Sequence, residues 1–247
     1  MSEISNDLIL AQSMPPGAVH TNSSKTPAAA NDALKKVKIL VRFAIENAWR
    51  ADDPTLHLKK FEEGEHHSWL ESEIAQYESK WPLGTRERLA FALLLHTGQR
   101  LSDVSKMVWG DIENNAIRVA QNKTRAKLVI PLHPELASAL AVLPKSHVAI
   151  LTTYFGRPFT SKGFGNWMAD RIERAGLPTR CVAHGLRKAA ARRPAEAGCS
   201  ANQIAAITGH TTLKEVSRYT RAAEQRGLAV AAFDNLKRHK SNKGSQT

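Results

Sequence analysis

The stretch that decides the fold is Thr85–Asp103, with the sequence TRERLAFALLLHTGQRLSD. Its first residue, a threonine, is a favourable N-cap, and an apolar run at 89–95 follows. Gly98 comes next, and helices commonly end at a glycine. These features predict one helix that stops at Gly98 and a second, short helix at about 102–108.

The residues after this stretch alternate between extended and helical patterns. Two short apolar segments flank a polar turn at 121–126, which predicts a β-hairpin. The expected strands are 116–120, 127–132 and 148–153, and the expected helices are 135–143, 161–175, 186–197, 201–207 and 213–236. The fold class is therefore α+β: a mostly helical domain with a small three-stranded antiparallel sheet.

The two ends of the chain differ from this domain. Residues 1–30 are rich in Ser, Asn, Pro, Ala and Thr without a sustained apolar period, so we expect a disordered leader. An apolar stripe predicts a helix at 31–50, which must pack on something else because one helix cannot bury its own stripe. A mixed, acidic linker with one short helix follows to residue 84. Residues 237–247 are basic, and we expect a mobile tail there.

Composition narrows the classes of protein. The chain has 247 residues, 42% of them hydrophobic, and no apolar run approaches the roughly 18 residues that a membrane span needs. The N-terminus lacks the basic and then apolar pattern of a signal peptide. Cys181 and Cys199 lie in no CxxC pair and near no metal-like histidine spacing. We therefore expect no structural metal, no membrane partner and a reducing compartment, the cytoplasm.

The charge of the chain is unevenly distributed. There are 35 Lys and Arg residues against 23 Asp and Glu, a formal net charge of +12. Residues 1–84 hold 9 of the basic and 12 of the acidic residues, which leaves 26 basic and 11 acidic residues, a net +15, for residues 85–247. Such a module is typical of a protein that binds a polyanion, most often nucleic acid. The alternative is an enzyme with a high isoelectric point.

Two motifs in the first half of the basic module offer cations. Arg100 stands in the sequence HTGQRLSD, at a turn between helices, where its planar fork can bind a phosphate through two hydrogen bonds. The ordinary alternative is a surface ion pair with Asp103. Lys123 lies at the tip of the expected hairpin, where it either enters a groove or stays a solvated turn residue.

Two further motifs lie in the second half. In His184–Arg187, HGLR, the His and the Arg are three residues apart, so both can lie on one face of a helix start. Gly209 permits a turn that points His210 into a cleft, and Tyr219 follows nine residues later. Ordinary alternatives exist here too, because HxxR is frequent by chance and Tyr219 could be a half-buried helix residue.

The order of these motifs resembles the tyrosine recombinase, or phage integrase, family. The resemblance extends to residues 97–103, to the sequence WGDI at 109–112, to Pro131-Leu132 at the end of the hairpin and to EAG at 196–198. It covers roughly residues 85–235. It implies a site-specific recombinase that cuts and rejoins double-stranded DNA through a 3′-phosphotyrosyl intermediate, without cofactor or metal. It also implies self-association into a tetramer on DNA, in the cytoplasm and at the nucleoid.

The resemblance implies a role for each motif residue. Arg100 and Arg187 would clamp the scissile phosphate, Tyr219 would be the nucleophile, and His184 would manage its proton. Lys123 would protonate the leaving 5′-oxygen, His210 would donate a hydrogen bond to the phosphate, and Asp103 would orient Arg100 or His184.

Two features depart from the family pattern. Pro194 falls inside the helix expected after HxxR, where a proline kinks a helix or starts a new one. In front, residues 31–84 resemble only the last helix of the family's helical core-binding domain plus a linker. We therefore expect a remnant of that domain before a catalytic domain at 85–236. The competing interpretations are a recombination-deficient DNA-binding relic and a topoisomerase-like enzyme that nicks and rejoins DNA.

Overall fold

The structure is a computed structural model that describes residues 27–62 and 64–244. The chain divides into two compact units, Met1–Glu65 and His66–Thr247. Most of the expected leader, residues 1–26, lies outside the described residues, as do residues 245–247 of the expected tail. Within the described part of the chain, no helix combines the length and the apolar character needed to cross a lipid bilayer.

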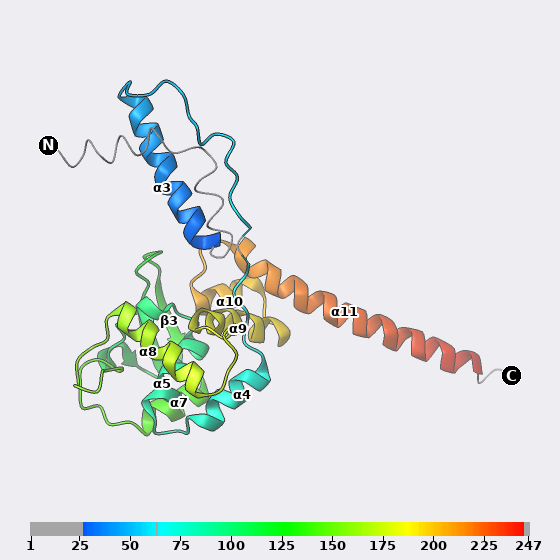
Figure 1. The fold of residues 1–247 in the computed structure, drawn as a ribbon. Helices are drawn as coiled ribbons and strands as arrows, with labels where there is room; N and C mark the ends of the chain where they lie inside the picture. The colour runs from blue at the N-terminus through cyan, green and yellow to red at the C-terminus, as the bar shows by residue number, and fades with distance from the viewer. Residues whose placement is uncertain (1–26, 63, 245–247) are drawn as a thin grey trace. The chain divides into compact units, whose positions relative to one another are not determined.

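The first unit contains one helix, α3 (Pro27–Glu46), among its described residues (Figure 1). The helix begins four residues earlier than the sequence suggested, with Ala30 buried in the added turn, and it ends at Glu46 rather than at about residue 50. Asn31 holds the extended segment beside the helix: its Nδ2 donates to Phe61 O at 2.9 Å and its Oδ1 accepts from Phe61 N at 2.8 Å. Of the predicted apolar stripe, Leu34 is buried, whereas Leu40 stays exposed in this unit.

The second unit is built around α5 (Arg86–Thr97), the helix of the deciding stretch. Thr85 Oγ1 accepts a hydrogen bond from Arg88 N at 3.2 Å, and Gly98 ends the helix with a left-handed φ of 61°. Both predicted caps are therefore confirmed. All residues from 89 to 95 are buried, because α5 is covered by α7 (Pro134–Ala141), α9 (Ala183–Glu196) and other neighbours (Figure 1).

Residues 66–84 belong to this second unit rather than to a linker. They include α4 (Glu71–Lys80), which supplies the buried Tyr77 to the core. The rings of Tyr77 and Phe91 of α5 stack with their centroids 4.5 Å apart, and Trp69 lies against both. Large aromatic side chains give this short, otherwise polar segment enough apolar surface to join the core.

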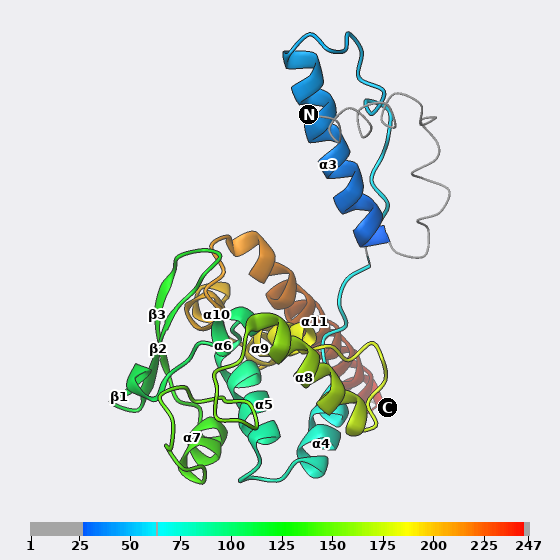
Figure 2. The ribbon, with the colours of Figure 1, turned by 60° about the vertical axis from the view of Figure 1, so that its left-hand side comes forward.

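The sheet has three antiparallel strands in the order β1 (Ile112–Glu113), β2 (Ala116–Ala120), β3 (Lys127–Pro131), as Figure 2 shows. The β2–β3 hairpin confirms the prediction, but the third strand was wrongly placed at 148–153. Those residues form only isolated bridges. The third strand of the sheet is instead β1, which pairs with β2. A two-residue turn, Asn114-Asn115, joins them, and its φ angles of 50° and 57° suit asparagine.

The other helices follow the predicted order: α6 (Leu101–Val104), which is shorter than the expected 102–108, α8 (Ser161–Arg174), α10 (Ala201–Thr208) and α11 (Leu213–Gly244). The 3₁₀ turn η1 (Trp109–Asp111) was not predicted from the sequence. Helix α9 is a single helix that passes through Pro194 and ends two residues later. The proline therefore affects only the last turn, far from His184 and Arg187 at the other end. Helix α11 continues to Gly244, so residues 237–244 of the expected tail are helical.

Candidate active site

Arg187 lies in the second turn of α9 and is buried, with 5% of its surface exposed. Its Nη1 donates to Gly98 O, at the end of α5, and to Thr208 O, 2.8 Å away at the end of α10. The C-terminal carbonyls of two helices thus surround the guanidinium with partial negative charge. Its Nη2 is buried and has no hydrogen-bond partner in the described part of the chain.

Arg100 is the residue before α6, and its Nη1 donates to Gln121 Oε1 at 3.3 Å. Neither Arg100 nor Arg187 forms an ion pair with a carboxylate among the described residues. Burial and the nearby charge of Arg100 lower the pKa of Arg187 to about 10, so it remains a cation at neutral pH. The site therefore holds two guanidinium groups without an ion pair to a carboxylate of the described residues, although the charges of Asp103 and Glu215 act on Arg187 from a distance.

Asp103 is buried in α6, and its charge acts on Arg187. Its buried Oδ1 accepts from Asn122 N at 3.0 Å, and its Oδ2 has no hydrogen-bond partner among the described residues. No hydrogen bond or ion pair joins it to Arg100 or His184 in this part of the chain. Asp103 instead holds the hairpin turn that carries Lys123 against α6.

His210 follows the left-handed Gly209 at the end of α10. Its Nδ1 lies 2.6 Å from Thr208 Oγ1, and its Nε2 lies 4.0 Å from a carboxylate oxygen of Glu215. Burial and the charge of Arg187 lower the pKa of His210 to about 4, against the opposing effect of Glu215. The ring is therefore neutral at pH 7.

His184 lies in the first turn of α9 and is exposed. Its ring centroid is 4.9 Å from that of His66. Partial desolvation, His66 and the cations Arg187, Lys188 and Arg100 lower its pKa, so the neutral imidazole, which can accept a proton, is favoured.

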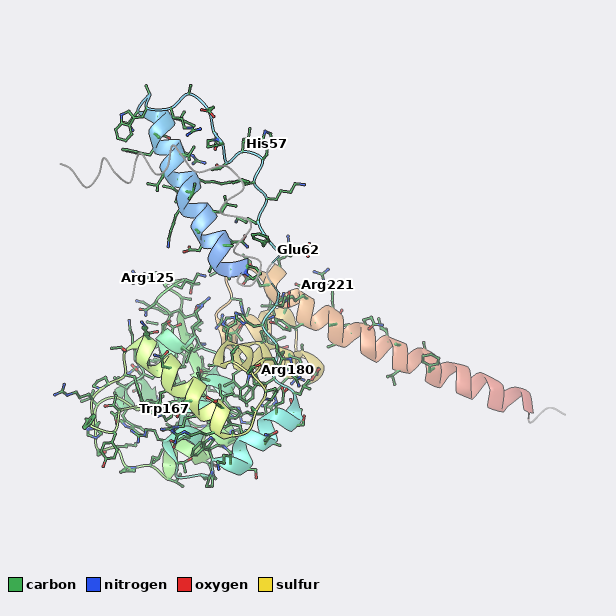
Figure 3. The ribbon with its side chains drawn as sticks, viewed as in Figure 1. His57, Glu62, Arg125, Trp167, Arg180 and Arg221 are labelled. Atoms are coloured by element: carbon green, nitrogen blue, oxygen red, sulfur yellow. The ribbon has the colours of Figure 1, made fainter. Side chains whose placement is uncertain are left out.

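In the described part of the chain, no hydrogen bond joins Lys123 or Tyr219 to Arg100 or Arg187. Lys123 is exposed in the hairpin turn, beside Arg125, which Figure 3 labels. Tyr219 is half-buried in α11 against Ile204 and other residues of a small core cluster. Its hydroxyl accepts from Arg218 Nη2 at 3.3 Å, and the Arg218 guanidinium lies 5.1 Å from the centre of its ring. The Tyr219 phenol has a small electrostatic effect on the pKa of Arg187.

Gln121 is a site residue to which the sequence analysis gave no role. It is 1% exposed, and its amide joins Arg100, Gln99 and Thr208. The side chains that alternate inward along β2 are Ile117 and Val119, and Gln121 is the next residue of that series. Extending the two-residue period of the strand by one step would have predicted a buried amide at this position.

Two groups of side chains in the described residues have the atom types of metal ligands. In the first, Glu73 accepts from Leu70 N, from His67 and from Arg180, which Figure 3 labels. Although desolvation opposes ionisation, these hydrogen bonds lower the pKa of Glu73 to about 2. Burial raises the pKa of Cys181 to about 12, so its thiol stays protonated. The Glu73 carboxylate thus already accepts hydrogen bonds at both of its oxygens, which leaves little capacity to bind a metal ion.

The second group is His96, His133 and Glu135. The two imidazole rings stack with a 4.3 Å centroid separation and an angle of 8° between their planes. Because ring nitrogens bind metals in the ring plane, parallel rings do not direct their lone pairs to one point. This group therefore suits packing better than coordination.

The basic, mainly helical domain, with two arginines that form no ion pair among the described residues, has the features typical of proteins that bind phosphate groups. The chain belongs to the phage integrase family, whose model matches residues 71–226.

Individual relatives agree with this assignment. The chain is 26% identical over 161 residues to tyrosine recombinase XerC of Listeria monocytogenes serotype 4b, a match that covers 60% of this chain but only 54% of that relative. It is 21% identical over 229 residues to tyrosine recombinase XerD of Lacticaseibacillus casei, covering 85% of this chain and 78% of the relative.

The fold is also that of a solved integrase. The crystal structure of a lambda integrase (75–356) dimer bound to a COC′ core site aligns with a TM-score of 0.71. The alignment covers 88% of this chain and 86% of that one, at 20% identity. The expected fold class, mostly helical with a three-stranded antiparallel sheet, is confirmed.

Proposed function

We propose that this chain is a tyrosine-type, site-specific DNA recombinase. The observation that carries the proposal is the pair Arg100 and Arg187. Both are attached to the Thr208 carbonyl, Arg187 directly and Arg100 through Gln121, and neither forms an ion pair with a carboxylate of the described residues. Arg100 lowers the pKa of Arg187, so the two guanidinium groups repel each other, and an anionic ligand bound between them relieves that repulsion. A phosphodiester supplies that anion.

The proposed reaction conserves the number of phosphodiester bonds. The oxygen of Tyr219 attacks phosphorus, a 3′-phosphotyrosyl bond forms, and the bond to the 5′-oxygen breaks. The phenol proton passes to neutral His184, and Lys123 gives a proton to the departing 5′-oxygen. Arg100 and Arg187 stabilise the extra charge of the pentacoordinate transition state. Attack by a 5′-hydroxyl of a partner strand reverses these steps and needs no external energy source.

Two steps of this reaction require movement or proton transfer. The hydroxyl of Tyr219, which accepts from Arg218 in the free chain, has to turn to the phosphate. His210 is neutral at pH 7 and its Nδ1 faces Thr208, so only Nε2 is available to the phosphate. With the Thr208 hydroxyl donating to Ile204 O at 2.8 Å, Nδ1 carries the ring proton, and Nε2 donates once the phosphate has raised the pKa of the ring.

The same proposal includes the partner and the place of action. Double-stranded DNA is the substrate, and the chain self-associates on it, as the dimeric lambda integrase does on its core site. Exchange of strands between two duplexes requires four active protomers, which gives a tetrameric synapse. The protein then works where the DNA is, in the cytoplasm at the nucleoid.

The test uses nicked suicide duplexes tiled across the DNA that flanks the gene for this chain. Loss of the short strand beyond the nick traps the covalent adduct, which migrates slowly on a denaturing gel. We expect an adduct with the wild-type chain and with Tyr154→Phe, a control in which an exposed tyrosine loses its hydroxyl. Tyr219→Phe should bind DNA equally well and form none. An adduct that survives in Tyr219→Phe would overturn the assignment of the nucleophile.

A further inference from the structure

Gln121 stands at the centre of the polar cluster beneath the two arginines. Its Oε1 accepts from Arg100 Nη1 at 3.3 Å and from Thr124 Oγ1. Its Nε2 donates to Gln99 Oε1 at 2.6 Å and to Thr208 O at 2.8 Å. A side-chain amide has two donor hydrogens and two acceptor lone pairs, so every one of them is used.

The orientation of this amide follows from its neighbours. Gln99 Nε2 donates to Thr97 O at 2.8 Å and to Ile207 O at 3.0 Å, both backbone carbonyls, so Gln99 Oε1 has to face Gln121. Because Gln99 Oε1 is an acceptor, the amide nitrogen of Gln121 has to face it as the donor. The oxygen of Gln121 then faces Arg100. The ends of α5 and α10 therefore fix the direction of the acceptor that Arg100 meets.

The same network connects the two arginines. Thr208 O accepts from both Gln121 Nε2 and Arg187 Nη1, each at 2.8 Å. Arg187 is thus attached directly to this carbonyl, and Arg100 is attached to it through one buried amide. Their relative position is set by a single backbone atom next to Gly209 and His210.

We propose that Gln121 is a positioning residue that holds Arg100 in register with Arg187 for the scissile phosphate. The inference rests on the proposed function and adds a residue to it. A neutral amide suits this task because it orients the guanidinium without neutralising it. A carboxylate at the same place would form an ion pair with Arg100 and compete with the phosphate.

The experiment measures single-turnover formation of the adduct on the suicide duplex, at saturating chain, together with the dissociation constant for the same duplex. Gln121→Met keeps the length of the side chain and removes all four hydrogen bonds. We expect its adduct rate to fall about 10- to 100-fold, as expected when a reacting group is misplaced, with a nearly unchanged dissociation constant. Gln76→Met is the matched control: Gln76 also donates to a backbone carbonyl, Ala175 O at 2.9 Å, and its variant should react like wild type.

A double-mutant cycle separates positioning from general loss of structure. If Gln121 acts through Arg100, then Gln121→Met should cause no further loss of rate in a chain that already carries Arg100→Ala. An equal loss in both backgrounds would mean a merely structural role and would overturn the inference.

Gln121→Glu gives a second, independent readout, because its carboxyl mimics the amide only when protonated. The ratio of its adduct rate to the wild-type rate should rise as the pH falls, whereas the ratio for Gln121→Met should stay flat. A flat ratio for both, or a wild-type rate in Gln121→Met, contradicts the inference and leaves the proposed function intact. Absence of any adduct with both wild type and Gln76→Met rejects the proposed function, and the inference falls with it.

Discussion

Arg187 Nη1 lies 2.8 Å from the carbonyl oxygen of Thr208, so the arginine of the HxxR motif is bonded to the turn that carries His210. Its second bond, to Gly98 O, reaches the turn that precedes Arg100. One buried guanidinium therefore joins three segments that are far apart in the sequence. These two hydrogen bonds give the side chains on the short helices and turns a fixed geometry. Even a conservative substitution of Arg187 should therefore disturb the site.

Arg187→Lys should lower the adduct rate about 100- to 1000-fold and change the dissociation constant for DNA little. Lysine keeps the charge, but its single ammonium cannot bond to two carbonyls and a phosphate in the planar arrangement of arginine. The loss then falls on the transition state, where one lost donor typically has this effect. Rate and binding are measured on the same suicide duplex.

Arg118→Lys is the control, because Arg118 is exposed and paired with Glu113 on the sheet. It should react like wild type. A loss of binding that equals the loss of rate in Arg187→Lys would make Arg187 an ordinary backbone contact.

Lys123→Ala should recover most of its lost rate on a duplex whose scissile phosphate carries a 5′-bridging sulfur. A thiolate leaves without a proton, so the general acid is not needed for that substrate. Arg187→Lys should not recover, since its loss concerns charge on the phosphate. The measurement is the ratio of adduct rates on the sulfur and oxygen substrates, and an unchanged ratio in Lys123→Ala would reduce Lys123 to a positioning charge.

The sequence was sufficient for features that depend on local physics. The caps of α5 and the β2–β3 hairpin follow from Thr85, from Gly98 and from an alternating pattern, and each occurs as predicted. The motif order also identified the family. These features depend on neighbours in the chain, so a single sequence specifies them.

The features that the sequence did not specify depend on tertiary contacts. The missed strand, β1, comes just before the Asn114-Asn115 turn, and asparagine at a left-handed position is a weaker signal than the usual Asn-Gly. Trp69 is buried through tertiary contacts: it lies against Tyr77 and Phe91 and donates a hydrogen bond to Val182 O. Asp103 accepts a hydrogen bond from the hairpin backbone at Asn122, a contact that no spacing along the chain encodes.

Acid should destabilise the chain through His96. Burial, His133 and nearby arginines lower the pKa of His96 to about 3, even though a Glu135 oxygen lies 3.1 Å away. The unfolded chain, with a histidine pKa near 6.5, then binds more protons than the native state between about pH 6.5 and 3. The free energy of unfolding therefore falls as the pH is lowered through this window, by up to about 1.4 kcal/mol per pH unit from this one residue.

Urea unfolding of wild type and His96→Gln at several pH values checks this expectation. Between pH 7 and 5 the wild type should lose about 2 kcal/mol more than the variant. Between pH 7.5 and 8.5, above both pKa values, the two chains should show the same change. Parallel curves at acidic pH would contradict the buried, neutral state of His96. His210, with its pKa lowered to about 4, contributes with the same sign, so His210→Gln should flatten the curve further.

Gly209→Ala should be far more damaging than Gly198→Ala, although both glycines have left-handed φ angles, +68° and +86°. An alanine in this region costs about 1–2 kcal/mol at either position. A Cβ at residue 198 meets nothing within 4 Å, whereas a Cβ at residue 209 lies 2.3 Å from Gln121 Nε2. Relief of that collision requires the buried amide to move and to give up hydrogen bonds, at about 1–3 kcal/mol for each group left unsatisfied.

The difference between the two variants in urea unfolding therefore measures how tightly the 209 turn is packed on Gln121. Gly209→Ala should also lower the adduct rate, because the displaced amide releases Arg100, while Gly198→Ala should react at the wild-type rate. Combining Gly209→Ala with Gln121→Ala removes the collision, so the double variant should be more stable than the sum of the two single losses predicts. Equal losses in Gly209→Ala and Gly198→Ala, or strict additivity in the double variant, would show that Gln121 and the turn are not in contact, and Arg100 would then need another anchor.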